Sequence, residues 1–262
     1  MIHIQKRRTP NIIKEQVEKI KNTPDSGYRG IVLPEDTKQL RQLFEQMPKD
    51  EIRLALYKEQ HGLCAYCMGK IHPDSENMKI EHYVALSESK KQALDYQNYL
   101  GVCYGGEKGE KDGTRVLCCD AARKDVKLTI NPWNKRQMEA IAYQRNGEIF
   151  VRNNLGLDNQ LVADMQKDID DVLGLNGKRD SKGRIVSDTS SKLIANRRGI
   201  YDSVSNQFQR WDKENCLTVE FLQDQIDKLE KQLARDNEAL PFIGVRLYFY
   251  KRKQEKLKRQ KL

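Results

Sequence analysis

Cysteines are the feature of this sequence that most constrains its fold. Cys216 stands apart, and the other five share one short window: Cys64, Cys67, Cys103, Cys118 and Cys119. The spacing of the first pair lets two thiolates reach one ion while the backbone turns tightly. A tetrahedral site needs two further ligands, and the available soft donors are Cys103 with either Cys118 or Cys119. The window therefore predicts a structural zinc site, with a set of buried free thiols as the alternative.

The composition indicates a soluble, helix-rich protein of the cytoplasm. The chain has 262 residues, of which 38% are apolar and 32% are charged. Its opening segment lacks the pattern of a secretory signal, and no stretch approaches the ~20 apolar residues of a membrane span. In a reducing compartment, cysteines favour metal binding over a disulfide framework. The 47 basic and 38 acidic residues give a net charge of +9, which favours a polyanionic partner such as nucleic acid.

Hydrophobic periodicity divides the chain into three regions and predicts a mainly α fold. Residues 1–61 form an N-terminal helical region, with apolar residues three and four apart in NIIKEQVEKIKN and KDEIRLALYKEQHG. Residues 62–132 change to short segments and turns around the cysteines. Residues 133–262 begin with a hairpin signal at Asn146-Gly147 and continue as a C-terminal helical region. Within that region, the polar stretch GKRDSKGRIVSDTSS is expected to be a surface loop.

Three further segments bear on binding. The glycine-rich loop between Cys103 and Cys118 lacks the Gly-Lys-Ser/Thr ending of a phosphate loop, which argues against nucleotide binding there. The basic run at the end of the chain is either a solvated helix end or a phosphate-contacting tail: KRKQEKLKRQKL. The aromatic run before it is either internal packing or a docking surface for a partner: LPFIGVRLYFYKR.

An acid–histidine pair, Glu81-His82, follows the first cysteines. The alternation of Met78, Ile80 and His82 predicts a strand that carries these three side chains on one face. Glu81 then points to the opposite face unless the strand ends there. Adjacent acid and histidine residues are common by chance, so the surrounding motifs decide what the pair means.

The order of these motifs resembles the HNH endonucleases over residues 62–131. The shared pattern is a cysteine pair, an acid–histidine pair, an asparagine, and a second cysteine region that leads into a helix with a lysine: Cys64, Cys67, Glu81, His82, Asn98, Cys103, Cys119, Asp120 and Lys124. A narrower resemblance is to the PtuB-type HNH proteins of Septu anti-phage systems, which also occur beside some retrons. It rests on the motifs IEH, NYLGVC, CDAARKD and INP, on the opening MIHIQKRRTP and on a helical half containing VLGLN and LIANRRG. The long insertion after Cys103 departs from the family pattern.

The resemblance implies a small zinc-stabilised ββα-metal core within the mainly α chain. Cys64, Cys67, Cys103 and Cys119 would hold the structural zinc, with Cys118 as the alternate fourth ligand. Zinc binding would supply folding free energy to an element too short to build a core of its own.

The resemblance also implies a catalytic site for Mg²⁺ or Mn²⁺. His82 would be the general base, since a neutral imidazole can take a proton from water near neutral pH. Glu81 and Asp120 would be oxygen ligands of the divalent cation. Asn98 would orient His82 or complete the metal shell, and Lys124 would hold a phosphate as a point charge.

The expected function is a metal-dependent endonuclease that hydrolyses phosphodiester bonds of DNA. The narrower resemblance implies the nuclease effector of a two-component anti-phage defence system, working with a PtuA-like ATPase subunit. The alternative is a zinc-stabilised nucleic-acid-binding or adaptor module in which Glu81 and His82 are inert. Two further alternatives are a ribonuclease and a toxin-like nuclease.

Overall fold

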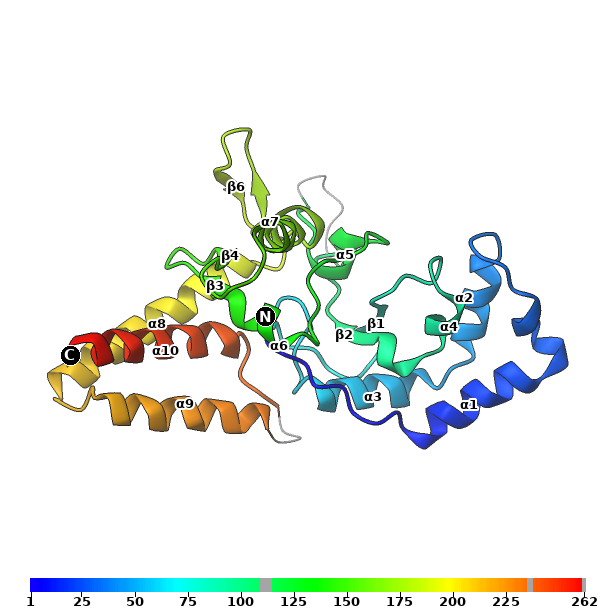
Figure 1. The fold of residues 1–262 in the computed structure, drawn as a ribbon, viewed down its shortest axis with the longest axis horizontal. Coiled ribbons are helices and arrows are strands. Elements are labelled where there is room, and N and C mark those ends of the chain that lie inside the picture. Colours follow the sequence, from blue (N-terminus) through cyan, green and yellow to red (C-terminus); the bar gives the residue numbers. More distant parts are fainter. Residues whose placement is uncertain (109–114, 235–237, 261–262) are drawn as a thin grey trace.

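The computed structural model (Figure 1) describes residues 1–108, 115–234 and 238–260. Helices make up 49% of the protein and the strands are few and short, which confirms the prediction of a mainly α chain. The N-terminal helices lie at one end of the molecule and the last three helices at the other, with short strands and turns between them. Among the described residues, no helix is both long and apolar enough to cross a membrane. The centre of the predicted glycine-rich loop, residues 109–114, lies outside the described residues.

Three helices and two short 3-10 turns build the N-terminal region: α1 (Asn11–Asn22), η1 (Pro24–Ser26), η2 (Tyr28–Gly30), α2 (Thr37–Glu45) and α3 (Lys49–Glu59). Each α-helix buries the apolar stripe that its sequence predicts, as Leu40, Leu43 and Phe44 show on α2. α2 packs against α4, and α3 packs against the two strands of the central region. The N-terminal helices therefore form a wall beside the Glu81-His82 segment.

Five short elements form the central region: β1 (Lys79–His82), α4 (Lys90–Ala93), η3 (Tyr96–Asn98), β2 (Tyr99–Val102) and α5 (Cys119–Arg123). The two strands pair antiparallel, with Glu81 opposite Leu100 and His82 opposite Tyr99. Every residue of β2 is buried, so this strand is the core of the region. Along the chain, α4 and η3 separate the two paired strands, and residues 103–118 separate β2 from α5.

Seven short elements connect the centre to the C-terminal helices: α6 (Lys135–Ala140), β3 (Ile141–Tyr143), β4 (Ile149–Val151), α7 (Asn159–Lys167), the π-helical turn η4 (Asp168–Val172), β5 (Lys178–Arg179) and β6 (Ile185–Ser187). The predicted hairpin at Asn146-Gly147 is confirmed, since β3 pairs with β4 and Gly147 has a φ of 93°. The predicted surface loop is instead the β5–β6 hairpin, because Gly183, with a φ of 75°, supplies a left-handed turn residue.

Three longer helices complete the chain: α8 (Leu193–Lys213), α9 (Val219–Leu233) and α10 (Ile243–Gln260). α10 packs against both α8 and α9 and lies between them in Figure 1. Ile243 and Val245 are fully buried, and the rings of Tyr250 and Trp211 meet edge-on at 5.9 Å. Of the two readings of the aromatic run, internal packing is therefore the one that the structure supports.

Candidate functional site

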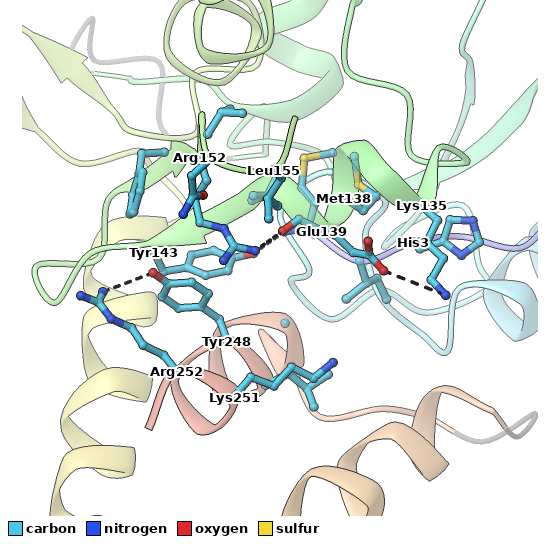
Figure 2. Close-up of a pocket in the computed structure, with 18 of the residues that line it drawn as sticks. His3, Lys135, Met138, Glu139, Tyr143, Arg152, Leu155, Tyr248, Lys251 and Arg252 are labelled. Atoms are coloured by element: carbon cyan, nitrogen blue, oxygen red, sulfur yellow. Dashed lines mark hydrogen bonds and ion pairs between the residues drawn. The ribbon is translucent and has the colours of Figure 1, made fainter. Parts of the chain in front are cut away.

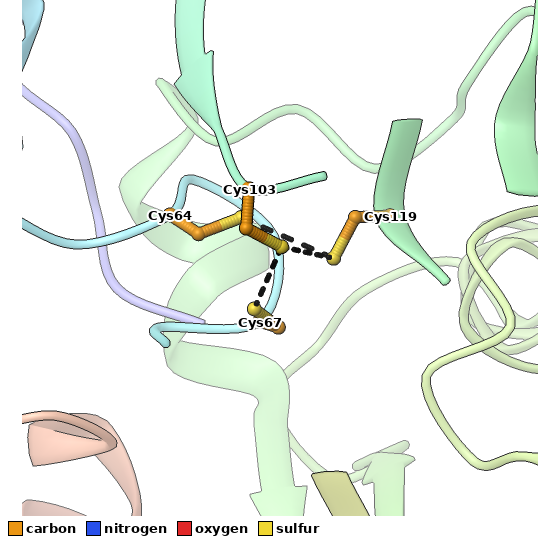
Figure 3. A group of neighbouring side chains, drawn as sticks. All are labelled: Cys64, Cys67, Cys103 and Cys119. Atoms are coloured by element: carbon orange, nitrogen blue, oxygen red, sulfur yellow. Dashed lines mark hydrogen bonds between the residues drawn. The ribbon is translucent and has the colours of Figure 1, made fainter. Parts of the chain in front are cut away.

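Four cysteine side chains converge at the centre of the molecule (Figure 3). Cys64 and Cys67 lie in the turn after α3, Cys103 directly follows β2, and Cys119 begins α5. The four sulfur atoms lie within 4.8 Å of one another, with Cys64 and Cys119 at 3.9 Å and Cys103 at 3.7 Å from both Cys67 and Cys119. Sulfurs at ~2.3 Å from a tetrahedral zinc lie about 3.8 Å apart. The group therefore fits a metal such as zinc.

The adjacent Cys118 is not part of this group. Its Sγ lies 3.8 Å from the hydroxyl oxygen of Ser191, and its N–H donates to the carbonyl of Gly105 at 2.9 Å. Cys119 has a left-handed φ of 57°, and its N–H donates to the carbonyl of Leu173 at 2.8 Å. These backbone contacts turn Cys119, rather than Cys118, toward the other three sulfurs.

The turn between the first two cysteines is shaped to support thiolates. The carbonyl of Cys64 accepts the N–H of Met68 at 3.0 Å, and Met68 has a left-handed φ of 63°. The next N–H, that of Gly69, donates to the sulfur of Cys67 at 3.3 Å. A donor aimed at sulfur stabilises the negative charge of a thiolate, which is the form that binds metal.

Two carboxyl groups, from Glu81 on β1 and Asp120 on α5, form the acidic part of the site. Burial and the neighbouring Asp120 raise the pKa of Glu81 well above its usual value, and Arg123 opposes this rise. Burial also disfavours ionised Asp120, but hydrogen bonding with Glu81 and the ion pair with Lys79 lower the pKa of Asp120 below its usual value. A hydrogen bond between two carboxyl groups requires one proton, and burial places it on Glu81.

Arg123 is the cation that holds Glu81 in place. Its Nη1 donates to Oε1 of Glu81, and the hydroxyl of Tyr66 donates to the same oxygen at 3.4 Å. The guanidinium, which is only 1% exposed, also donates to the backbone carbonyls of His82 and Tyr83. Arg123 therefore fixes both the carboxyl group and the end of the strand that carries it.

His82 lies in an aromatic pocket beside the end of β1. Its Nε2 is 2.9 Å from the carbonyl oxygen of Ala93, which can only accept, so Nε2 carries the proton and Nδ1 has the free lone pair. The imidazole meets the rings of Phe44 at 4.4 Å and Tyr99 at 4.9 Å, both edge-on. Burial lowers the pKa of His82 from 6.5 to about 4. The imidazole is therefore neutral at neutral pH.

Glu81 and His82 are neighbours in sequence but face different groups. Glu81 contacts Tyr66, Asp120 and Arg123, whereas His82 contacts Phe44, Tyr99 and Ala93. This division follows the alternation of side chains along a strand. The structure thus brings Glu81 to Asp120 and places His82 on the other side of β1.

Asn98 ties together the backbone around His82. Its side chain accepts the N–H of Val84 at 2.8 Å and donates to the carbonyls of Val84 and Gln92 at 2.9 and 3.1 Å. Gln92 precedes Ala93, whose carbonyl holds the imidazole. Asn98 is therefore placed to orient His82 through the backbone, while its own hydrogen bonds go to Val84 and Gln92 rather than to the imidazole.

Lys124 lies outside this contact network, at the exposed end of α5, with a φ of 56°. The buried cation is its neighbour Arg123, which the sequence interpretation missed. A signal was available, because Arg123 follows Cys119 by four residues and so lies on the same helix face. Tyr66 was missed as well, and its position between the first two cysteines gave no comparable signal.

A separate cavity of about 940 Å³ lies between the β3–β4 hairpin and helices α9 and α10 (Figure 2). Arg152 and Tyr248 face it from opposite walls. None of the predicted site residues is among the described residues that line it, so this cavity is distinct from the candidate site.

No protein-family model and no curated protein matches the chain.

Proposed function

We propose that this protein is an HNH-type endonuclease that hydrolyses phosphodiester bonds of DNA with a divalent cation. The observation that carries the proposal is that the turn after α3, the end of β2 and the start of α5 converge on one cysteine group, next to the strand β1 that pairs with β2. β1 supplies Glu81 and His82, and α5 supplies both Asp120 and Cys119, one of the four converging cysteines. An acid pair and a neutral imidazole are thereby held within the short segment that runs from β1 to α5.

A structural zinc on the four cysteines would hold the segment from β1 to α5 in place. The paired strands are only four residues each and α5 has five residues, which is too little to form an independent core. Metal binding would cross-link the turn after α3, the end of β2 and the start of α5. The free energy of binding would then be folding free energy for the site.

Glu81 and Asp120 would hold Mg²⁺ or Mn²⁺. Carboxylate oxygens are the donors that such hard cations prefer, and binding the cation would displace the proton that burial places on Glu81. The bound cation would supply stabilisation of the charge that develops on the phosphate. Lys79 and Arg123 would retain the orientation of the two acids, and Lys124 would contact a phosphate from the exposed end of α5.

His82 would act as the general base. The Ala93 carbonyl fixes the proton on Nε2, so the lone pair of Nδ1 can accept a proton from a water molecule. The same carbonyl would stabilise the imidazolium that results. Burial keeps His82 neutral at the pH of the cytoplasm, which leaves Nδ1 free to accept a proton, and the same lowered pKa of about 4 makes it a weaker base than a free imidazole.

The resemblance to PtuB-type proteins supports a biological setting for this activity. We propose that the protein is a cytoplasmic nuclease effector of an anti-phage system and that a PtuA-like ATPase is its partner. The division of labour would be that the partner hydrolyses ATP and this chain cuts DNA. Co-expression followed by co-purification with such an ATPase tests this setting.

One observation favours a second candidate, a zinc-stabilised nucleic-acid-binding or adaptor module. Arg123 and Lys79 already pair with the two acids, and the His82 ring packs against Phe44 and Tyr99 as a core residue would. In that case the four-cysteine group would support a binding surface without catalysis.

Plasmid cleavage with Mg²⁺ or Mn²⁺ separates the two candidates. Wild type should nick or linearise the plasmid, and His82→Ala should reduce the rate by ~10²–10⁴-fold, as expected for loss of a general base. His72→Ala is the matched control, because His72 is an exposed histidine that has no role in the proposed site. Cleavage by His82→Ala at the rate of wild type would exclude the assigned base, and an inactive wild type that binds DNA would favour the adaptor.

A further inference from the structure

Cations from the N-terminal helices gather on the side of β1 that carries His82. Phe44 of α2 contacts the imidazole, and Nζ of Lys49 lies 3.8 Å from the centroid of the same Phe44 ring. The positive charges of Arg41 and Lys49 both act on His82 and oppose its protonation. Arg41 projects from α2 and Lys49 from the start of α3, so the two helices jointly place positive charge beside the imidazole.

Arg41 is exposed and accessible to a ligand, and Lys49 is partly accessible, with 19% of its side chain exposed. Lys49 pairs with Glu45 at 3.0 Å, but the Glu45 side chain is 66% exposed, and ion pairs with exposed partners contribute only ~0–1 kcal/mol. Because the Glu45 carboxylate is exposed, a phosphate oxygen can compete with it for the exposed part of Lys49.

Packing fixes the two cations relative to the imidazole. α2 contacts α4, whose last residue, Ala93, holds Nε2 of His82, and α3 contacts β1 itself. Phe44 lies between Lys49 and His82 and is buried. A ligand bound by Arg41 and Lys49 would consequently be held at a defined position near the general base, separated from it by the Phe44 ring.

We propose that Arg41 and Lys49 bind the backbone phosphates of DNA next to the bond that is cut. The proposal rests on the nuclease function proposed above and assigns the N-terminal helices a role in it. Arginine offers a planar fork of donors and lysine a compact point charge, and both suit phosphate oxygens. Such contacts hold the DNA by its backbone and need no particular base sequence.

The test measures binding without cleavage. A short fluorescent DNA duplex is titrated with the full chain at several salt concentrations, in the absence of added Mg²⁺ or Mn²⁺. The double variant Arg41→Gln/Lys49→Gln should flatten the dependence of log K on log[salt] by about 2, since each phosphate contact contributes ~0.9 to the slope. Arg198→Gln/Lys213→Gln removes two exposed cations from α8 and should leave the slope unchanged.

Each outcome decides the proposal. Equal slopes for wild type and the double variant, an equal effect of the α8 control, or no DNA binding by wild type would overturn it. If circular dichroism shows that the double variant is unfolded, Arg41→Gln alone is measured instead. Because Arg41 is exposed, this variant should fold, and loss of one contact should change the slope by about 1. Retention of the wild-type slope by Lys49→Arg is expected as well.

Parallel cleavage assays separate this proposal from the nuclease proposal. Binding of DNA by wild type through Arg41 and Lys49, without cleavage of plasmid with either cation, would support the phosphate contacts and refute the proposed nuclease function. If wild type cuts DNA and the double variant keeps full binding and full cleavage, the nuclease function is supported and the proposed phosphate contacts are refuted.

Discussion

Adjacent cysteines at the start of α5 occupy different environments and should respond differently to the same substitution. Cys119→Ser replaces one of the four converging sulfurs with a hydroxyl, a much poorer zinc ligand, whereas Cys118→Ser changes a side chain that faces Ser191. We expect about one zinc per chain in wild type and in Cys118→Ser. Cys119→Ser should lose most of the zinc and unfold at a lower temperature, as metal analysis and thermal denaturation would show. If Cys118→Ser lost its zinc while Cys119→Ser kept it, Cys118 rather than Cys119 would be the fourth zinc ligand.

The choice between these two cysteines depends on contacts that are remote in sequence. The metal-type clustering was evident from spacing, but Cys118 and Cys119 are equivalent by that criterion. The carbonyl of Leu173, more than fifty residues away along the chain, accepts the N–H of Cys119 and helps set its left-handed backbone. The four-residue spacing from Cys119 favours Arg123 over Lys124 as the buried cation, but that spacing decides only once Cys119, rather than Cys118, is known to face the other sulfurs.

Among the secondary-structure elements, the β3–β4 hairpin depends most directly on a single glycine. Gly147 has a φ of 93°, and a Cβ at this position would lie 2.2 Å from the carbonyl oxygen of Ile194 at the start of α8. Its own carbonyl accepts the Nε of Arg197 at 2.6 Å. The turn and α8 are therefore in backbone contact, which leaves no room for a side chain.

We expect Gly147→Ala to destabilise the protein far more than Gly183→Ala. Both residues have a left-handed φ, which costs ~1–2 kcal/mol for a residue with a Cβ, but Gly183 has no atom within 4 Å of the added Cβ. The clash at Gly147 should add about 1–3 kcal/mol of overpacking. Urea denaturation of the two variants measures the difference in free energy of unfolding. Equal losses would mean that the turn moves away from α8 without cost.

The two hairpins differ in how readily they can be predicted from the sequence. Asn146-Gly147 joins two alternating apolar runs, so the first hairpin has both a turn signal and a core-facing pattern. The strands of the second hairpin have two and three residues and are exposed or partly exposed, which is too short for any alternation to register. The long helices were recognised because each buries a continuous stripe on one face.

The whole molecule depends on its last helix, although that helix is far in sequence from the candidate site. α10 contacts α8, α9 and β3, forms one wall of the cavity in Figure 2 and reaches the cysteine region. At that point Gly244 lies close to Met68, which directly follows Cys67, since a Cβ on Gly244 would be 2.7 Å from the Met68 sulfur. The N–H of Phe242 also donates to the Met68 carbonyl at 3.0 Å. The C-terminal region therefore supports the turn that carries Cys64 and Cys67.

A chain that ends before Pro241 should fail to fold. The truncation removes a set of buried apolar side chains on α10: Ile243, Val245, Leu247, Phe249 and Tyr250. Burial of each contributes ~1.5–3 kcal/mol, so together they match the ~5–15 kcal/mol net stability of a typical domain. A chain that ends at Lys256 is the control, because it keeps these residues and loses mainly the exposed basic end. Circular dichroism and zinc content should be close to wild type for the control and strongly reduced for the longer deletion. If the longer deletion still melted cooperatively with one zinc per chain, α10 would be an appendage, and its aromatic face would again be a candidate surface for the ATPase partner.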